Sequence, residues 1–179
     1  MKMLRTAVPI LALSALAAAG CFLISGQFVV TYQLPDPLNV VNGATLVGVD
    51  VDLNTIGDYA DHKDDLKRVE DLALIGDFKN NTGSTANIEV WIVSSGTLLG
   101  LTLAQVQANG VQLWGPLSVG AGATRNIDWN GSSGLFKGRQ TLIDEIKGDG
   151  HFALYVIANG AFNCTVTNGA VIAVVGAAK

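Results

Sequence analysis

Five Asn-Gly dipeptides divide this chain into segments in which apolar and polar residues alternate. The dipeptides lie at 42–43, 109–110, 130–131, 159–160 and 168–169. Both residues tolerate the positive φ angles of the tight turns that join antiparallel strands, so Asn-Gly between alternating segments predicts hairpins. A chain with this pattern is expected to fold mainly from antiparallel strands.

The alternation itself places the strands. In 46–53, Val47, Val49 and Val51 share one face, while Asp50 and Asp52 point to the other. Similar patterns predict further strands at 28–32, 72–78, 87–95, 117–119, 125–129, 151–158, 161–167 and 170–176. The last three are expected to form a meander that turns at the last two Asn-Gly dipeptides.

Two segments have helical spacing. The first covers 62–71, with Asp61 as its N-cap, and the second covers 138–147, with Gly148 as its C-cap. The segment 102–109 fits either a short helix or the first arm of a hairpin.

Eight or nine strands with two short helices in the connections predict an antiparallel β-sandwich. A flattened β-barrel is the alternative. About 150 residues are enough to bury a core without disulfides, so we expect one domain over residues 28–179.

The first 21 residues have the order of a bacterial export signal. Lys2 and Arg5 precede an apolar stretch at 7–17, and small residues then lead to Cys21. The end of this segment, Ala18-Ala19-Gly20-Cys21, resembles the lipobox of bacterial lipoproteins, although Ala18 stands where that family prefers Leu.

The resemblance implies a processing pathway and an anchor. The Cys21 thiol would receive a diacylglyceryl group, the signal peptide 1–20 would be removed, and the new amine would be acylated. Residues 21–27 would then form a short lipidated tether, because strand-like sequence begins at Phe28. Two or three acyl chains give stable membrane attachment. Phe22 occupies the position at which Asp often signals inner-membrane retention, so the outer membrane is favoured over the inner.

Three alternatives to the lipid anchor stay open. The apolar run at 7–24 is just long enough to span a bilayer as an uncleaved helix, and an ordinary signal peptidase site follows Ala19. A disulfide between Cys21 and Cys164 would also exclude lipidation, because the chain has only these two cysteines. We expect Cys164 to be a buried, inert thiol, as free cysteines usually are.

The charge balance restricts the partners. The whole chain carries a formal net charge of −4, and removal of 1–20 leaves 9 basic and 15 acidic residues, a net charge of −6. An acidic domain repels nucleic acid and gains nothing from an anionic membrane surface. Membrane attachment is therefore expected to be apolar or covalent.

One acidic segment begins like a calcium-binding loop. Asp50, Asp52 and Asp61 stand at the first, third and twelfth positions, but the sixth is Thr55 instead of Gly. We interpret the segment as the solvated face of a strand followed by a helix cap. A weak cation site that also includes Asp58 is the alternative, and we expect no metal and no cofactor.

No catalytic motif has the required spacing. Gly-Ser-Ser-Gly at 131–134 differs from a nucleophile elbow and is interpreted as a loop, and 120–124 lacks the lysine of a phosphate loop. A hydrolase that uses His151, Asp149 and a distant serine is the weakest hypothesis. We therefore expect a protein that is not an enzyme.

The three tryptophans have different expected environments. Trp129 is predicted in the core, and Trp114 half-buried at a strand end. Trp91 shares a strand face with Glu89, where it either packs under a helix or contributes to a binding surface.

The favoured function is a membrane-anchored interaction or assembly module of the cell envelope. Its surface would include Trp91 and Tyr155, and its partner would be an envelope protein or a glycan. The alternative is a carrier that holds a small hydrophobic ligand between its sheets, which would need a cavity of about 300 Å³ or more.

Overall fold

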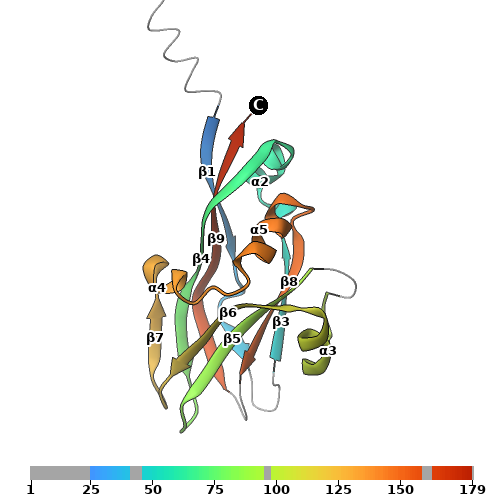
Figure 1. Ribbon diagram of the computed structural model, residues 1–179. Helices are drawn as coiled ribbons and strands as arrows, with labels where there is room; N and C mark the ends of the chain where they lie inside the picture. The colour runs from blue at the N-terminus through green and yellow to red at the C-terminus, as the bar shows by residue number, and fades with distance from the viewer. Residues whose placement is uncertain (1–24, 41–45, 95–97, 159–162, 179) are drawn as a thin grey trace, which may run out of the picture.

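The computed structural model describes residues 25–40, 46–94, 98–158 and 163–178. Its strands form two antiparallel sheets of five and four strands, as shown in Figure 1, which confirms the predicted β-sandwich. The alternative of a flattened barrel is wrong for the described strands, because they fall into two separate sheets.

The larger sheet, sheet A, contains two strands of 15 residues that run its full length. Its strands are β1 (Ser25–Gln33), β2 (Leu38–Val40), β4 (Leu66–Asn80), β7 (Thr124–Ile127) and β9 (Cys164–Ala178). The order is β1-β9-β4-β7, and β2 pairs with the first residues of β9 on the same side as β1. Ser25 pairs with Ala178, so the described chain begins beside its C-terminal strand. Figure 1 shows both ends at the same tip of the molecule.

The smaller sheet, sheet B, has the order β3-β8-β5-β6. Its strands are β3 (Leu46–Asp52), β5 (Ala86–Val93), β6 (Val111–Val119) and β8 (His151–Ala158). Their alternation follows the sequence pattern, with the inner face buried against sheet A.

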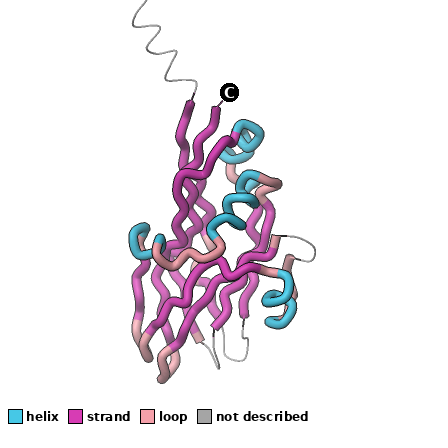
Figure 2. The backbone as a smooth tube through the Cα atoms, viewed as in Figure 1, coloured by secondary structure: helices cyan, strands magenta, loops and turns pink. Residues whose placement is uncertain are grey.

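Four α-helices lie in the connections, as Figure 2 shows in cyan. They are α2 (Gly57–His62), α3 (Leu103–Asn109), α4 (Trp129–Ser133) and α5 (Arg139–Lys147), and two 3₁₀ turns cover Leu53–Thr55 and Lys63–Asp65. The predicted helix at 138–147 is confirmed as α5. The open question at 102–109 is decided for a helix, because Thr102 and Gln105 form a capping box at the start of α3.

The predicted helix at 62–71 is wrong. The helix α2 ends at His62, and β4 begins at Leu66. Register shifts between Leu66 and Arg68, and again between Val69 and Asp71, interrupt the alternation at the start of this strand. Such β-bulges leave apolar residues three apart, which imitates helical spacing.

The predicted meander after residue 150 is also wrong. Strand β8 belongs to sheet B and β9 to sheet A, so these two consecutive strands do not pair. The segments 161–167 and 170–176 lie in one strand, β9, from Cys164 onward. Asn168, with φ of 54°, and Gly169 form a bulge opposite Gly76 of β4 instead of a turn.

Two other Asn-Gly dipeptides also lie outside hairpin turns. Asn109 is the last residue of α3 and Gly110 is its C-cap, while Asn130 and Gly131 lie inside α4. The dipeptides at 42–43 and 159–160 lie outside the described residues. Within the described chain, therefore, Asn-Gly ends a helix, lies in a helix or forms a bulge, and makes no hairpin turn.

Trp114 is the largest fully buried side chain, which corrects the prediction that it is half-buried. Its ring stacks on Phe78 of sheet A with centroids 5.5 Å apart. Its indole N–H donates to the buried Ser132 hydroxyl at 3.2 Å. Trp129, predicted in the core, is only half-buried, and its indole donates to the Asp71 carboxylate at 3.0 Å.

Ser132 joins the two sheets along one side of the sandwich. Its Oγ also accepts the backbone N–H of Leu74 at 2.8 Å, beyond the point where β7 stops pairing with β4. The segment 131–134, expected as a loop, therefore belongs mostly to α4 and supplies a hydrogen-bond acceptor for the uncovered part of β4.

Candidate functional site

A second, smaller apolar cluster lies on the outer face of sheet B. Residues 98–109, which include α3, cover this face and bring Val106 into one cluster with Val93 and Ile157. This arrangement uses a long connection to bury a sheet face that would otherwise meet solvent.

Tyr155 lies at the centre of this cluster and is only 1% exposed. Its hydroxyl donates to the carbonyl of Leu98 at 2.8 Å and accepts the N–H of Leu101 at 3.2 Å. Gly48 on the neighbouring strand leaves room for the ring, because a Cβ there would lie 2.8 Å from a ring carbon. The expectation that Tyr155 belongs to an exposed surface is therefore corrected: it holds the covering segment in place.

Trp91 lies beside Tyr155 in the sheet and is half-buried at the margin of the cluster. Its indole N–H donates to Glu89 Oε2 at 3.0 Å. On the other side, Gln112 of β6 pairs with Trp91, and the buried Gln112 Nε2 has no hydrogen-bond partner among the described residues. We call Glu89, Trp91 and Gln112 the Trp91 patch.

Long-range pairing creates the Trp91 patch, which is why the sequence pattern reveals only part of it. Glu89 and Trp91 are two residues apart on one strand and were recognised as neighbours. Gln112 joins them through the β5–β6 register, which includes two irregularities and could not be read from alternation alone. The patch offers an aromatic ring and a carboxylate acceptor on one sheet face, with the buried Gln112 amide beside them.

The hydrolase hypothesis requires a hydrogen bond between the side chains of Asp149 and His151, and the structure pairs the His151 ring with Asp50 instead. His151 Nε2 lies 2.9 Å from Asp50 Oδ1, while the Asp149 carboxylate accepts the backbone N–H of His151 at 3.0 Å. None of the hydrogen bonds of His151 within the described chain involves a serine. The arrangement is an exposed contact between an imidazole and a carboxylate at the end of sheet B.

In the acidic segment, Asp52 caps the 3₁₀ turn that follows it. The Asp52 carboxylate accepts the side-chain amide of Asn54 at 2.8 Å and its backbone N–H at 3.0 Å, and these hydrogen bonds hold the pKa of Asp52 below its usual range. Asp58 and Asp61 are exposed on α2. Across the described ranges, no three or more His, Cys, Asp and Glu side chains gather where they would hold a metal ion.

Cys164 is fully buried at the start of β9, which confirms the prediction for this thiol. Burial raises the pKa of Cys164 to about 11, so the reactive thiolate is strongly disfavoured at neutral pH. Cys21, the predicted lipidation site, and the preceding signal segment lie outside the described residues.

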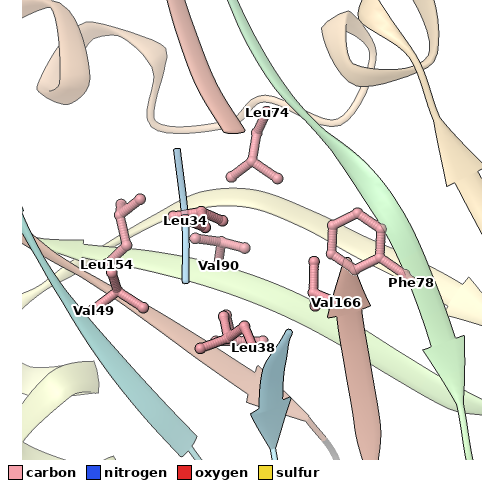
Figure 3. Close-up of a pocket in the computed structure, with 9 residues that line it drawn as sticks. Leu34, Leu38, Val49, Leu74, Phe78, Val90, Leu154 and Val166 are labelled. Atoms are coloured by element: carbon pink, nitrogen blue, oxygen red, sulfur yellow. The ribbon is translucent and has the colours of Figure 1, made fainter. Parts of the chain in front are cut away.

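Figure 3 shows a pocket between the two sheets, lined by nine apolar side chains. Leu38 and Val166 approach it from sheet A, and Val90 and Leu154 approach from sheet B. The cavity has a volume of about 10 Å³. This is room for about one water molecule, whereas a ligand carrier needs at least about 300 Å³.

The strand nearest the predicted anchor is tightly held. Strand β1 pairs with β9 over all nine of its residues, from Ser25 opposite Ala178 to Gln33 opposite Ala170. The described chain therefore starts at the tip of sheet A, four residues after Cys21.

No helix in the described part of the chain is both long enough and apolar enough to cross a membrane. No protein-family model matches the chain, and no curated protein is detectably similar to it.

Proposed function

We propose that this chain is a lipid-anchored protein of the bacterial cell envelope that acts as a non-enzymatic interaction or assembly module. One observation carries the proposal: β1 begins at Ser25 and is paired from its first residue with β9. The domain thus starts almost immediately after Cys21, as a module held close to a membrane would require.

The length of the tether supports this placement. Four residues in extended conformation reach about 13 Å. With lipid on Cys21, the tip of sheet A would lie within that distance of the bilayer, and Phe22 would favour the outer membrane over the inner. The membrane would then be the first partner of the protein.

The Trp91 patch is the surface that we assign to a second partner, an envelope protein or a glycan. A half-buried tryptophan gives a large contact area with little loss of conformational entropy, and polar groups beside it set orientation. The Glu89 carboxylate, which accepts the Trp91 indole N–H at 3.0 Å, supplies such a polar group at the edge of the ring. The small cavity gives the carrier alternative no comparable support.

Intact mass analysis of the full chain, purified from bacterial membranes, tests the anchor. We expect a polypeptide that begins at Cys21, with added mass equal to a diacylglyceryl group and a further acyl chain. Cys21→Ala should abolish the added mass, whereas Cys164→Ala, as the matched control, should retain it. A mature chain that begins at another residue, or that has no added mass, would overturn the anchor.

The second partner is tested by capture on the anchored protein. Native membranes are cross-linked, and the proteins and glycans recovered with the wild-type chain are compared with those recovered with Trp91→Ala. We expect a specific component whose recovery falls at least tenfold in the variant. Val111→Ala is the control, because Val111 is an exposed apolar residue of the same sheet outside the patch. Equal recovery with both variants would exclude the Trp91 patch as the contact surface.

A further inference from the structure

The outer edge of β1 differs from the other sheet edges in having no cover. The strand pairs with β9 on one side, and no described strand or loop hydrogen-bonds to its other side. Nine residues, Ser-Gly-Gln-Phe-Val-Val-Thr-Tyr-Gln, contain no charge and no proline. Charges, prolines and covering segments are the usual means of keeping an edge from pairing with another chain.

The other edges each have such protection. Strands β7 and β2 are only four and three residues long, and β3 carries Asp50 and Asp52. The edge of β6 is covered by 135–138, through hydrogen bonds from Gly115 N–H to Leu135 O and from Lys137 N–H to Leu113 O. Among the edges formed by the described residues, that of β1 is therefore the exception.

The direction of the free backbone groups follows from one hydrogen bond. The Leu34 N–H donates to Gly169 O at 2.9 Å and continues the register of β1 with β9. In antiparallel strands every second residue exchanges hydrogen bonds with its partner, so the even-numbered residues of β1 bond to β9. Gln27, Val29 and Thr31 consequently direct their N–H and C=O groups away from the sheet.

We infer that a second copy of this chain pairs with the outer edge of β1 through its own β1, in an antiparallel dimer centred on Val29. This register overlaps the whole of both strands, from Ser25 of one copy opposite Gln33 of the other. It forms about ten hydrogen bonds, two for each hydrogen-bonded pair. Because β1 has no charge, no like charges oppose each other at any position.

The exposed apolar side chains also favour a two-fold axis at Val29. Val29 is the most exposed large apolar side chain of the described residues, at 53%. On the two-fold axis it would lie opposite its own copy, and the half-buried Ile172 and Val174 of each β9 would flank the pair on the outer face. A closed two-fold contact also leaves no further edge of β1 available, so the assembly stops at two copies.

The dimer deepens the proposed function by naming a partner, and it depends on that function only for placing both copies on one membrane. In the antiparallel arrangement the two Ser25 residues are about 27 Å apart, eight residue steps of about 3.4 Å. If the paired strands lie along the membrane surface, both tethers of about 13 Å reach the same bilayer. Anchoring would raise the local concentration of the two copies.

Thiol cross-linking in intact membranes tests the contact. Full-length chain carrying Val29→Cys is treated with a short bifunctional maleimide, and we expect a covalent dimer. The wild type should give none, because Cys164 is buried and the Cys21 thiol carries the lipid of the proposed anchor. Thr124→Cys, at the exposed opposite edge of sheet A, is the matched control. A Val29→Cys chain that remains monomeric, or that cross-links only to a different protein, would overturn the inference.

A charge introduced at Val29, on the two-fold axis of the dimer, provides the second test. Sedimentation of the detergent-solubilised full chain should show a dimer whose dissociation constant rises at least tenfold in Val29→Lys. Val111→Lys, at a valine of β6 that is 43% exposed, should leave the dimer unchanged. Intact mass is measured on the same samples: acylated chain without dimer refutes only the pairing, whereas dimer without acylation refutes only the anchor. An unchanged dimer in Val29→Lys would exclude β1 as the contact.

Discussion

The two long sides of the sandwich are closed in different ways. On the side of β7 and β6, the buried Ser132 bonds to both sheets. Arg139 donates to the carbonyl of Glu70, at the edge of β4 that β7 does not reach. On the side of β1 and β3, the hydrogen bond from the Tyr32 hydroxyl to Asp50 O, at 2.6 Å, bridges the sheets. We call these the closed side and the open side. The comparison teaches that the segment 132–139 protects the edges of the closed side, whereas β1 on the open side retains backbone groups able to bind a partner.

The largest expected effect comes from Trp114 on the closed side. Trp114→Ala should lower the free energy of unfolding by about 3–5 kcal/mol, because it removes a fully buried ring and leaves a cavity. Urea unfolding measures the change, and Trp129→Ala, at a half-buried tryptophan, should cost clearly less. Equal costs would show that the closed side does not depend on the ring between the sheets.

Ser132→Ala should cost about 2–3 kcal/mol. It leaves two buried donors, the Leu74 N–H and the Trp114 indole, without an acceptor. Ser133 is exposed and adjacent in the sequence, so Ser133→Ala provides the control and should change stability by less than about 0.5 kcal/mol. If the two variants unfold at the same denaturant concentration, the hydroxyl does not join the sheets.

Tyr32→Phe, on the open side, should cost only about 1 kcal/mol. Asp50 O is on an exposed edge, so water can replace the lost hydroxyl. Burial, followed by the charges of Asp50 and Asp52, raises the pKa of Tyr32, so the donor stays protonated throughout the neutral range. A loss as large as that of Ser132→Ala, measured by the same unfolding assay, would remove the distinction between the two sides.

The smallest effect concerns Asp71 at the edge of β4. Burial tends to raise the pKa of Asp71, but the Leu72 N–H, the Trp129 indole and Arg139 together hold it below its usual value. A lowered folded-state pKa contributes stability above about pH 4 that is lost as the pH falls through the folded-state value. Asp71→Asn should therefore be slightly less stable than wild type at pH 7.

Unfolding curves at a series of pH values check this expectation. The difference in stability between wild type and Asp71→Asn should shrink steadily between pH 5 and pH 2. A constant difference over that range would mean that the charge of Asp71 contributes nothing to the closed side.

The strand content of the fold was predictable, but its connections were not. Alternation identified β3 and β8 because each has one face in a core and few irregularities. The same signal cannot distinguish a turn from a bulge, and Asn168 with Gly169 therefore suggested a hairpin inside what is a single strand. The bulges at the start of β4 similarly produced helical spacing in an exposed strand.

The candidate surfaces depended on contacts between distant segments. Trp91 and Glu89 were recognisable as neighbours from their spacing on one strand, whereas no local pattern indicates that 98–109 folds back over Tyr155. The bare edge of β1 was equally hidden, because only the strand order shows that β1 ends a sheet. Local patterns thus predict the faces of strands, and topology decides which faces and edges remain accessible.

The pairing of Ser25 with Ala178 also determines how the protein would respond to mechanical load. If a partner pulls on sheet B while the tether is held, tension runs along β1, and the hydrogen bonds to β9, which are perpendicular to the strands, are loaded in shear at the same time. If the two termini are pulled apart instead, the pairs open one after another from Ser25. The same ladder would therefore resist a pull between membrane and partner at high force and unzip at low force when pulled by its ends.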